Sequence, residues 1–458
     1  MQLHKKLVTL TLTLLILISI SASFAASVET YSLSWSFPIL SPTYTILQNA
    51  LDSIGQVLYF GSGQNFYPYN YLYAVNITNG QMIWNYDTIQ PVNYISHFKY
   101  NNSDHIIVGI GGSTTIPLQS YVLAFRDSQN NATLWISPNL KSSVACVCSV
   151  ESNVTDTEDV VAGLQNGTVV RLYGNSTGIA TIEWQYNAIG VVQDIVQLNN
   201  GTVVVGTSDA IAPYEGHIYC LDKNGRLLWS YDSTSDDPLI PGLVKEFGGA
   251  NNDGGPNVVA VFYNGSICVL SGTTGNGIAP WPFNTGAGNA VRDLLCTQDY
   301  TGDGFPDMVV STQNGSLMII NGRTAKPVLS STLLSSYVVA YIQYMYSYEN
   351  GASYLNKTLA VSLENTTTSY VPLICGVNVT NFAVTGQIPT PGEVVAQNLF
   401  SVSNYTSTFT GDLLFTTNNV IYFLAGSNII TSEFPFPVTF IVLIIVVWLS
   451  IVILRRRR

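Results

Sequence analysis

Residues 71–86 read YLYAVNITNGQMIWNY, and this stretch holds the pattern on which the fold depends. A run of apolar and aromatic residues leads to a polar turn at Asn79 and Gly80, and a second run follows with Trp84 inside it. Two strand-like runs joined by an asparagine–glycine turn are typical of a β-hairpin. Two further stretches have the same form: YVLAFRDSQNNATLWIS at 121–137 and HIYCLDKNGRLLWSY at 217–231.

A short apolar strand recurs along the chain at intervals of 43 to 55 residues. Its eight copies begin at Val57, Ile106, Val160, Val203, Val258, Met308, Leu359 and Leu413. No segment between residues 30 and 430 shows a sustained period of 3.6 residues, so the chain is predicted to be all-β. Four short strands per unit make a sheet that can bury its faces only against neighbouring sheets, which predicts an eight-bladed β-propeller over residues 26–433.

The eighth unit lacks the strand that carries the tryptophan. Near the N-terminus, YSLSWSFPI at 31–39 has the ending of such a strand with no other strand before it. We therefore expect the strand around Trp35 to complete the last blade and to close the ring, which would leave no unpaired edge between the first and last blades. An open solenoid is the alternative.

The stretch AVNITNGQMIW at 74–84 is similar to the Ala-x-Asp-x-x-Thr-Gly-x-x-x-Trp docking motif of quinoprotein-like (PQQ-like) eight-bladed propellers. Asn76 and Asn79 stand in the Asp and Thr places. In that family the tryptophan stacks on the neighbouring blade, so the resemblance implies blade docking by a set of tryptophans. The set is Trp35, Trp84, Trp135, Trp184, Trp229 and Trp281. The family's enzymes carry a quinone beside adjacent cysteines, which this sequence lacks, so PQQ is not expected as a cofactor.

The acidic corner, DYTGDGFPD at 299–307, is similar to the Asp-x-Asn-x-Asp-Gly-x-x-Asp calcium loop of FG-GAP (integrin α-type) propeller repeats. Calcium takes six or more oxygen ligands, and a glycine such as Gly304 allows the chain to wrap around the ion. The predicted ligands are the side chains of Asp299, Thr301, Asp303 and Asp307 and the carbonyl of Phe305. Thr301 replaces the usual Asn or Asp, which weakens the expected affinity. A solvated acidic turn is the alternative.

Two weaker copies of the acidic corner lie at the same offset in other units, GANNDGGPN at 249–257 and ESNVTDTED at 151–159. The first lacks the leading carboxylate, which leaves it a weaker case for an ion, and the second lacks the glycine and is predicted to be a turn.

Both ends of the chain resemble targeting segments. Residues 1–25 have two lysines, an apolar run and small residues at a cleavage site, which predicts a signal peptide, with an uncleaved anchor as the alternative. Residues 434–454 predict a transmembrane helix, and the arginines at 455–458 predict a cytoplasmic tail; a buried hydrophobic helix is the alternative. Thirteen Asn-x-Ser/Thr triplets agree with export and predict a glycoprotein. The arrangement resembles archaeal membrane-anchored surface proteins, with the propeller outside the cell membrane.

Charge and motifs exclude several functions. Of 17 lysines and arginines, six lie in the terminal segments, so 11 face 28 acidic residues in between, and nucleic acid is not an expected partner. The histidines lack metal-pair spacing, and there is no nucleophile elbow or phosphate loop, so no catalytic residue is predicted and the chain is not expected to be an enzyme. Asp194 and Asp293 occupy matching places on expected innermost strands, where they could face the channel; capping of backbone amides is the alternative.

These features favour a membrane-anchored, extracytoplasmic β-propeller that acts as a protein-interaction or scaffold module, with structural calcium and an unknown protein or envelope partner. Two alternatives remain open. One is a quinone-dependent dehydrogenase-like enzyme, which the resemblance would imply if a quinone were bound. The other is a structural component of the cell envelope that packs laterally through its blades.

Overall fold

The structure is a computed structural model that describes most residues between 28 and 429. The described ranges are 28–38, 45–51, 57–63, 70–100, 103–112, 119–126, 132–152, 158–174, 178–212, 214–233, 237–248, 255–286, 289–333, 337–349, 352–365, 373–382, 384–389, 397–402, 412–416 and 420–429. The predicted signal peptide (1–25), transmembrane helix (434–454) and basic tail (455–458) lie outside these ranges. Within the ranges, no helix has the length and apolar character needed to cross a bilayer.

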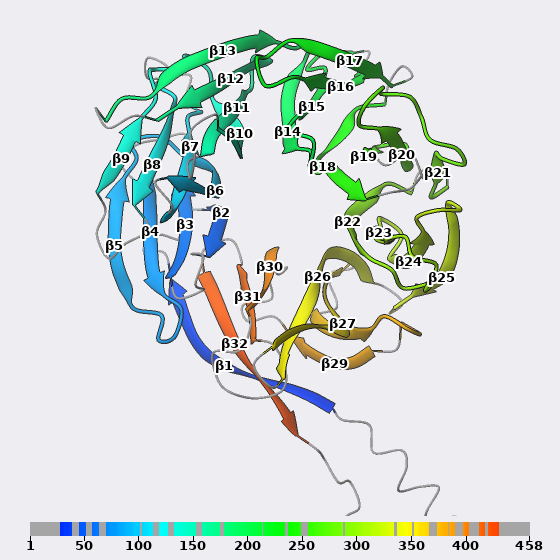
Figure 1. Cartoon of the computed structure of the whole chain (residues 1–458). Coiled ribbons are helices and arrows are strands. Elements are labelled where there is room, and N and C mark those ends of the chain that lie inside the picture. Colours follow the sequence, from blue (N-terminus) through cyan, green and yellow to red (C-terminus); the bar gives the residue numbers. More distant parts are fainter. Residues whose placement is uncertain are drawn as a thin grey trace, which may run out of the picture.

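The described residues form eight four-stranded antiparallel sheets, which Figure 1 shows arranged in a ring. In seven sheets, four strands that follow one another in the chain pair in order from the inside of the ring to the outside. The all-β prediction is confirmed. Each recurring apolar strand that the sequence revealed is the second strand of its sheet.

The first four sheets run through the N-terminal half of the ring. Their strands are β2 (Thr45–Leu51), β3 (Val57–Gly63), β4 (Tyr71–Asn76) and β5 (Met82–Asp87); β6 (Val92–Tyr100), β7 (Ser103–Ile110), β8 (Tyr121–Arg126) and β9 (Thr133–Ile136); β10 (Val144–Glu151), β11 (Glu158–Leu164), β12 (Thr168–Tyr173) and β13 (Thr181–Asn187); and β14 (Val191–Gln197), β15 (Val203–Ser208), β16 (Gly216–Leu221) and β17 (Leu227–Asp232).

The other four sheets complete the ring. Their strands are β18 (Leu239–Gly248), β19 (Pro256–Phe262), β20 (Ser266–Ser271) and β21 (Phe283–Asn284); β22 (Val291–Gln298), β23 (Asp307–Thr312), β24 (Ser316–Asn321) and β25 (Lys326–Thr332); β26 (Tyr337–Glu349), β27 (Ala352–Asn365), β28 (Leu373–Asn378) and β29 (Val384–Pro389); and β30 (Gln397–Val402), β31 (Asp412–Thr416), β32 (Val420–Ile429) and β1 (Val28–Pro38).

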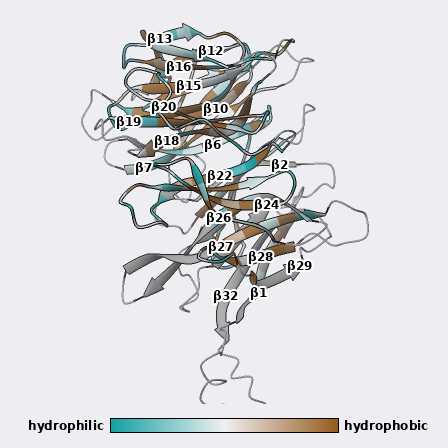
Figure 2. Cartoon of the chain, turned by 90° about the vertical axis from the view of Figure 1, so that its right-hand side faces the viewer, coloured by the Kyte–Doolittle hydropathy of each residue, from teal (hydrophilic) through white to brown (hydrophobic). Residues whose placement is uncertain are grey.

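Burial on both sides holds each sheet in place. Every residue of β15 and β16 is buried, whereas the fourth strand β17 alternates between exposed and covered positions. A strand covered on both faces requires apolar residues at consecutive positions, which explains the continuous β-branched runs of the second strands. Figure 2 shows hydrophobic stretches along many of the strands, whereas the outer strand β13 is mostly hydrophilic. Cores therefore form between neighbouring sheets, as where Val204 and Ile218 join Val258 and Phe262.

Asparagine–glycine turns join several second strands to third strands. Gly167 and Gly315 have φ values of 85° and 83°, a region that glycine adopts without a steric cost. The side-chain oxygens of Asn166 and Asn314 accept the N–H groups of the residues two positions on. Local sequence chemistry therefore forms these asparagine–glycine turns.

The last sheet combines both ends of the described chain. β1 pairs antiparallel with β32, and Trp35 lies opposite Phe423 in this pairing. The order β1, β32, β31, β30 places β1 in the outermost position, which tryptophan strands hold in other sheets. The ring of Phe37 on β1 packs edge-on against Phe60 of the first sheet, with 5.5 Å between ring centroids. The last sheet therefore contacts the first.

Because all sheets share one strand order, equivalent turns lie on the same face of the ring. We call one face the Asp209 face: it carries the turns between second and third strands and the connections from each fourth strand to the next sheet. The opposite Asp299 face carries the turns between first and second and between third and fourth strands. The paired ends Val28 and Ile429 lie on the Asp299 face.

All six cysteines are free thiols. Cys148 is partly buried and the others are buried. Burial raises the pKa of the Cys148 and Cys375 thiols to about 11, so these groups stay protonated and unreactive at neutral pH.

Candidate functional site

The acidic corner connects the end of β22 to the start of β23 on the Asp299 face. Carboxylate oxygens of Asp299, Asp303 and Asp307 lie within 4.8 Å of one another. Asp299 accepts the N–H groups of Gly304 at 2.8 Å and Gly302 at 2.6 Å, and these bonds, Gly304 first, hold its pKa below the usual range. Both glycines have left-handed φ values, 85° and 77°, so the corner depends on glycine to wrap its amides around the carboxylate.

Asp307 is the buried member of the acidic corner, with no exposed surface. Its Oδ2 accepts the N–H groups of Tyr300 at 2.8 Å and Thr301 at 2.9 Å, and its Oδ1 accepts the N–H of Gly322 at 3.0 Å. The bond to Gly322 ties the corner to the turn that follows β24. Asp307 therefore joins two turns of one sheet.

Asn321 is a residue of this corner that the sequence pattern did not reveal. Its Nδ2 donates to Thr301 Oγ1 at 2.9 Å and to Asp303 Oδ2 at 2.8 Å. The asparagine ends β24, 18 residues after Asp303, so no local spacing connects the two. Phe305, whose carbonyl is a predicted ligand, has its ring covered by Arg323, with 4.9 Å from the guanidinium carbon to the ring centroid.

In two other sheets, the residue at the position of Asp307 is either paired with a basic side chain or uncharged. On β11 it is Asp159, 2% exposed, whose Oδ2 lies 2.6 Å from Nη2 of Arg171. On β19 it is the buried, uncharged Asn257. Around the acidic corner, no lysine or arginine of the described residues lies within 4 Å of a carboxylate oxygen. Three carboxylates therefore converge there without a basic partner from the described chain.

Three of the predicted docking tryptophans donate a hydrogen bond to the next sheet. In each case the acceptor is a backbone carbonyl in the turn between the third and fourth strands of that next sheet. The pairs are Trp184 Nε1 to Lys223 O at 2.9 Å, Trp229 Nε1 to Gly272 O at 3.0 Å, and Trp281 Nε1 to Gly322 O at 3.2 Å. Each indole thus spans the junction between two sheets.

The remaining tryptophans differ in their contacts. Trp84 stacks on Phe125 of the second sheet with 6.0 Å between ring centroids. Trp135 is 1% exposed and packs with Leu172 of the third sheet, but its Nε1 has no hydrogen-bond acceptor in the described chain. The side chain of Trp35 lies outside the described residues.

Asp194 and Asp293 lie on the innermost strands β14 and β22, each directly after a β-bulge. One carboxylate oxygen of each accepts the N–H of the following residue. The other accepts an N–H from the innermost strand of the next sheet, Val244 at 3.1 Å and Ile342 at 2.9 Å. Burial raises the pKa of Asp194 to about 6 and also raises that of Asp293. Both aspartates therefore link neighbouring sheets through backbone amides at the inner wall.

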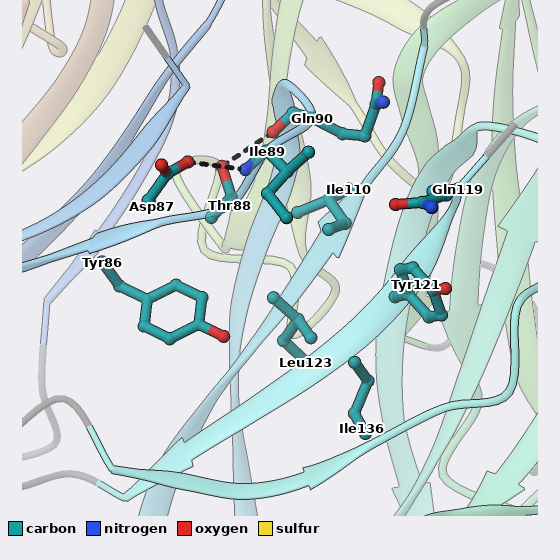
Figure 3. Close-up of a pocket in the computed structure, with 10 residues that line it drawn as sticks. All are labelled: Tyr86, Asp87, Thr88, Ile89, Gln90, Ile110, Gln119, Tyr121, Leu123 and Ile136. Carbon is teal, nitrogen blue, oxygen red and sulfur yellow. Dashed lines mark hydrogen bonds between the residues drawn. The ribbon is translucent and has the colours of Figure 1, made fainter. Parts of the chain in front are cut away.

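A small pocket opens on the Asp209 face where the connection between β5 and β6 meets the second sheet (Figure 3). Its floor is apolar, and its rim is fixed by two local bonds: Ile89 N–H to Asp87 Oδ1 at 2.9 Å, and Thr88 Oγ1 to Gln90 O at 2.7 Å. The lining residues are Tyr86, Asp87, Thr88, Ile89, Gln90, Ile110, Gln119, Tyr121, Leu123 and Ile136.

Large apolar side chains remain exposed in turns of the same face. They come from the connections and second-to-third turns of four different sheets. They are Ile89 (47% exposed), Ile189 (62%), Ile211 (79%), Tyr214 (48%) and Tyr263 (54%). The Asp209 face therefore offers separated apolar contacts on a rigid ring.

The comparisons with known proteins identify the fold. No protein-family model matches the sequence, and no curated protein matches it. Among solved structures, the chain is similar to the C-terminal WD40 domain of Sif2, with a TM-score of 0.60 at 10% identity over 87% of this chain and 99% of that one. It is also similar to BamB from Moraxella catarrhalis, with a TM-score of 0.53 at 14% identity over 86% and 97% of the two chains.

A third similar structure is Sqt1 from Saccharomyces cerevisiae, with a TM-score of 0.51 at 12% identity over 74% of this chain and 96% of that one. Identities this low establish a shared fold and no more. Together with the ring of antiparallel sheets, they show that the chain is a β-propeller repeat protein.

Proposed function

We propose that the chain is a closed eight-bladed propeller that binds a partner protein through its Asp209 face. The observation that carries the proposal is the exposure of Ile189, Ile211 and Tyr263 in turns of one face. A partner that covers these side chains would bury apolar surface, which gains free energy on binding. The fold shared with the WD40 domain of Sif2 and with BamB supports an interaction or scaffold role.

The proposed membrane anchor would orient this surface. Val28 and Ile429 pair at the Asp299 face, so a transmembrane helix at 434–454 would follow within a few residues on that side. A propeller held in this way presents its Asp209 face away from the bilayer. The surface that carries the exposed apolar residues would then meet partners outside the cell.

The test compares matched surface variants of the full-length chain in its native membrane. Ile211→Asp and Ile189→Asp place a charge on the Asp209 face, and Val328→Asp, 57% exposed on the outer strand β25, is the control. After crosslinking and purification, we expect the co-purifying protein to be lost from both face variants and kept by Val328→Asp. Equal recovery from all three variants would place the contact elsewhere.

We also propose that the acidic corner binds a calcium ion, as in FG-GAP-type loops. The donor set fits: carboxylates of Asp299, Asp303 and Asp307 converge with the hydroxyl of Thr301, and hard oxygen donors suit calcium. The charge comparison supports it, because Asp159 at the matching corner has an arginine partner and the acidic corner has none among the described residues. Calcium would supply the missing positive charge and hold the corner in its wrapped form.

Calorimetry and thermal melts with and without chelator test this proposal. The full-length wild type should bind one calcium ion at the corner, Asp303→Ala should lose that binding, and Asp222→Ala, in the turn between β16 and β17 on the same face, should keep it. A ligand at about 100 times its dissociation constant raises the free energy of unfolding by about 2.7 kcal/mol. Calcium stabilisation that persists in Asp303→Ala would show that the ion binds at another place.

A further inference from the structure

His217 lies in a cluster of carboxylates on the Asp209 face that no sequence motif indicates. The ring is 5% exposed and belongs to β16. In the strand register, His217 pairs directly with Asp232 of β17. Asp209 and Glu215 stand at the two ends of the turn between β15 and β16, joined by the bond from Asp209 N–H to Glu215 O at 2.9 Å.

Alternation along the strands places these side chains on one side of the sheet. Side chains two positions apart point the same way, so Glu215 and His217 share a side, and directly paired residues such as His217 and Asp232 share it as well. One ligand atom from each of Asp209, Glu215 and His217 lies within 4.8 Å of the other two. Tertiary pairing thus gathers a nitrogen donor and several oxygen donors.

The two ring nitrogens of His217 have different roles. Nδ1 lies 2.8 Å from Asp232 Oδ1, and a carboxylate can only accept, so Nδ1 carries a proton that it donates. Metal-binding histidines are commonly oriented by a carboxylate in this way, which leaves Nε2 as the ligand. Here Nε2 faces Asp209 Oδ1 at 3.4 Å.

That distance is long for a direct hydrogen bond and is compatible with a shared metal ion. An N–H···O bond is typically about 2.7 to 3.2 Å. Two ligand atoms about 2.1 Å from a tetrahedral zinc ion lie about 3.4 Å apart. The spacing of Nε2 and Asp209 Oδ1 therefore matches two corners of a tetrahedral site, and Glu215 is close enough to supply a third.

We propose that His217 Nε2, Asp209 and Glu215 form a site for a divalent transition metal ion of the zinc class, with Asp232 orienting the imidazole. The imidazole donor distinguishes this site from the all-oxygen acidic corner, because nitrogen ligands suit zinc and its neighbours better than calcium. Three protein ligands leave one coordination position for water or an external donor. The metal proposal does not rest on the proposed protein partner, although Ile211 and Tyr214 lie in the same turn.

The test measures zinc retained by tag-free, full-length protein after chelator treatment and dialysis against zinc. Wild type should hold one zinc ion at this site, and His97→Gln, a histidine variant in the second sheet, should hold the same amount. His217→Gln and Asp209→Asn should lose it, and Asp232→Asn should bind 10- to 100-fold more weakly because the imidazole is no longer held. Cobalt in place of zinc should give the visible absorption of a tetrahedral site in wild type and in His97→Gln, and should give none in His217→Gln or Asp209→Asn.

Two results would overturn the proposal. One is no zinc in the wild type, which would leave His217 as a hydrogen-bond partner of Asp232 beside Asp209. The other is equal zinc in wild type and Asp209→Asn, which would mean adventitious surface binding. Asp209 is 25% exposed, so Asp209→Asn decides the question if His217→Gln does not fold. Asp303→Ala should keep its zinc, which separates this site from the proposed calcium corner.

Discussion

Replacing Gly275 by alanine tests whether the packing of Trp229 against the turn after β20 stabilises the contact between neighbouring sheets. Gly275 lies in the turn after β20 with φ 73°, and the indole of Trp229 from the preceding sheet lies against it. An added Cβ would lie 2.6 Å from Cε3 and 2.7 Å from Cδ2 of that ring, distances that force the ring to move. Gly277, two residues on, is a matched control because nothing lies within 4 Å of an added Cβ there.

The expected cost has three parts. An alanine held in the left-handed region costs about 1 kcal/mol. Displacing a packed side chain from a tight junction costs about 1 to 3 kcal/mol. Moving the indole of Trp229 also lengthens its 3.0 Å hydrogen bond to Gly272 O, and losing such a bond costs about 1 kcal/mol. We expect Gly275→Ala to lower the free energy of unfolding by about 3 to 5 kcal/mol in total, and Gly277→Ala to leave it unchanged or raise it by up to about 1 kcal/mol.

Equilibrium unfolding of full-length protein in urea measures both changes. A double-mutant cycle adds specificity: in a Trp229→Leu background the added Cβ meets no indole, so Gly275→Ala should cost only the backbone term. The reasoning is refuted if the two glycine variants have equal stability, or if the cost of Gly275→Ala is the same with and without the indole.

Three further predictions concern charge and exposure. The pKa of the Asp194 carboxyl is about 6 in the folded chain and about 4 in the unfolded chain, so the folded state holds the proton more tightly. The contribution of this group to the free energy of unfolding is therefore fully present below about pH 4. It falls by up to about 3 kcal/mol as the pH rises through 6. Urea titrations across pH should show this slope in wild type and a flatter one in Asp194→Asn; equal slopes would contradict it. Arg171→Met leaves the buried Asp159 carboxylate without its partner, whose Nη2 lies 2.6 Å away. In the same assay it should lower the free energy of unfolding by about 3 to 5 kcal/mol, and a decrease of less than about 1 kcal/mol would contradict this prediction. Ile211→Cys should react in intact cells with a membrane-impermeant maleimide. Wild type should not, because five of its free thiols are buried and burial keeps the partly buried Cys148 thiol protonated, with a pKa of about 11. Equal labelling would disprove the proposed orientation.

The sequence alone predicted the features that depend on near neighbours in the chain. Alternating and β-branched runs determined the all-β class, because a strand buried on both sides needs apolar residues wherever the sheet is covered. The Asn-Gly turn at Asn314 and Gly315 followed from the conformations those residues allow. The spacing of Asp299, Asp303 and Asp307 likewise indicated a wrapped loop, since all three belong to one turn.

Only the tertiary structure decided which groups meet across repeats. The bond from Val244 N–H to Asp194 joins residues 50 positions apart, and Asn321 reaches Asp303 from the far end of a hairpin. His217 acquires its carboxylate neighbours through strand register and a turn, so its isolated place in the sequence carries no sign of them. The physical reason is that these contacts depend on how the strands pair and how the sheets pack around the ring. That packing results from many weak interactions along the whole chain, so the spacing of residues within one short segment does not reveal it.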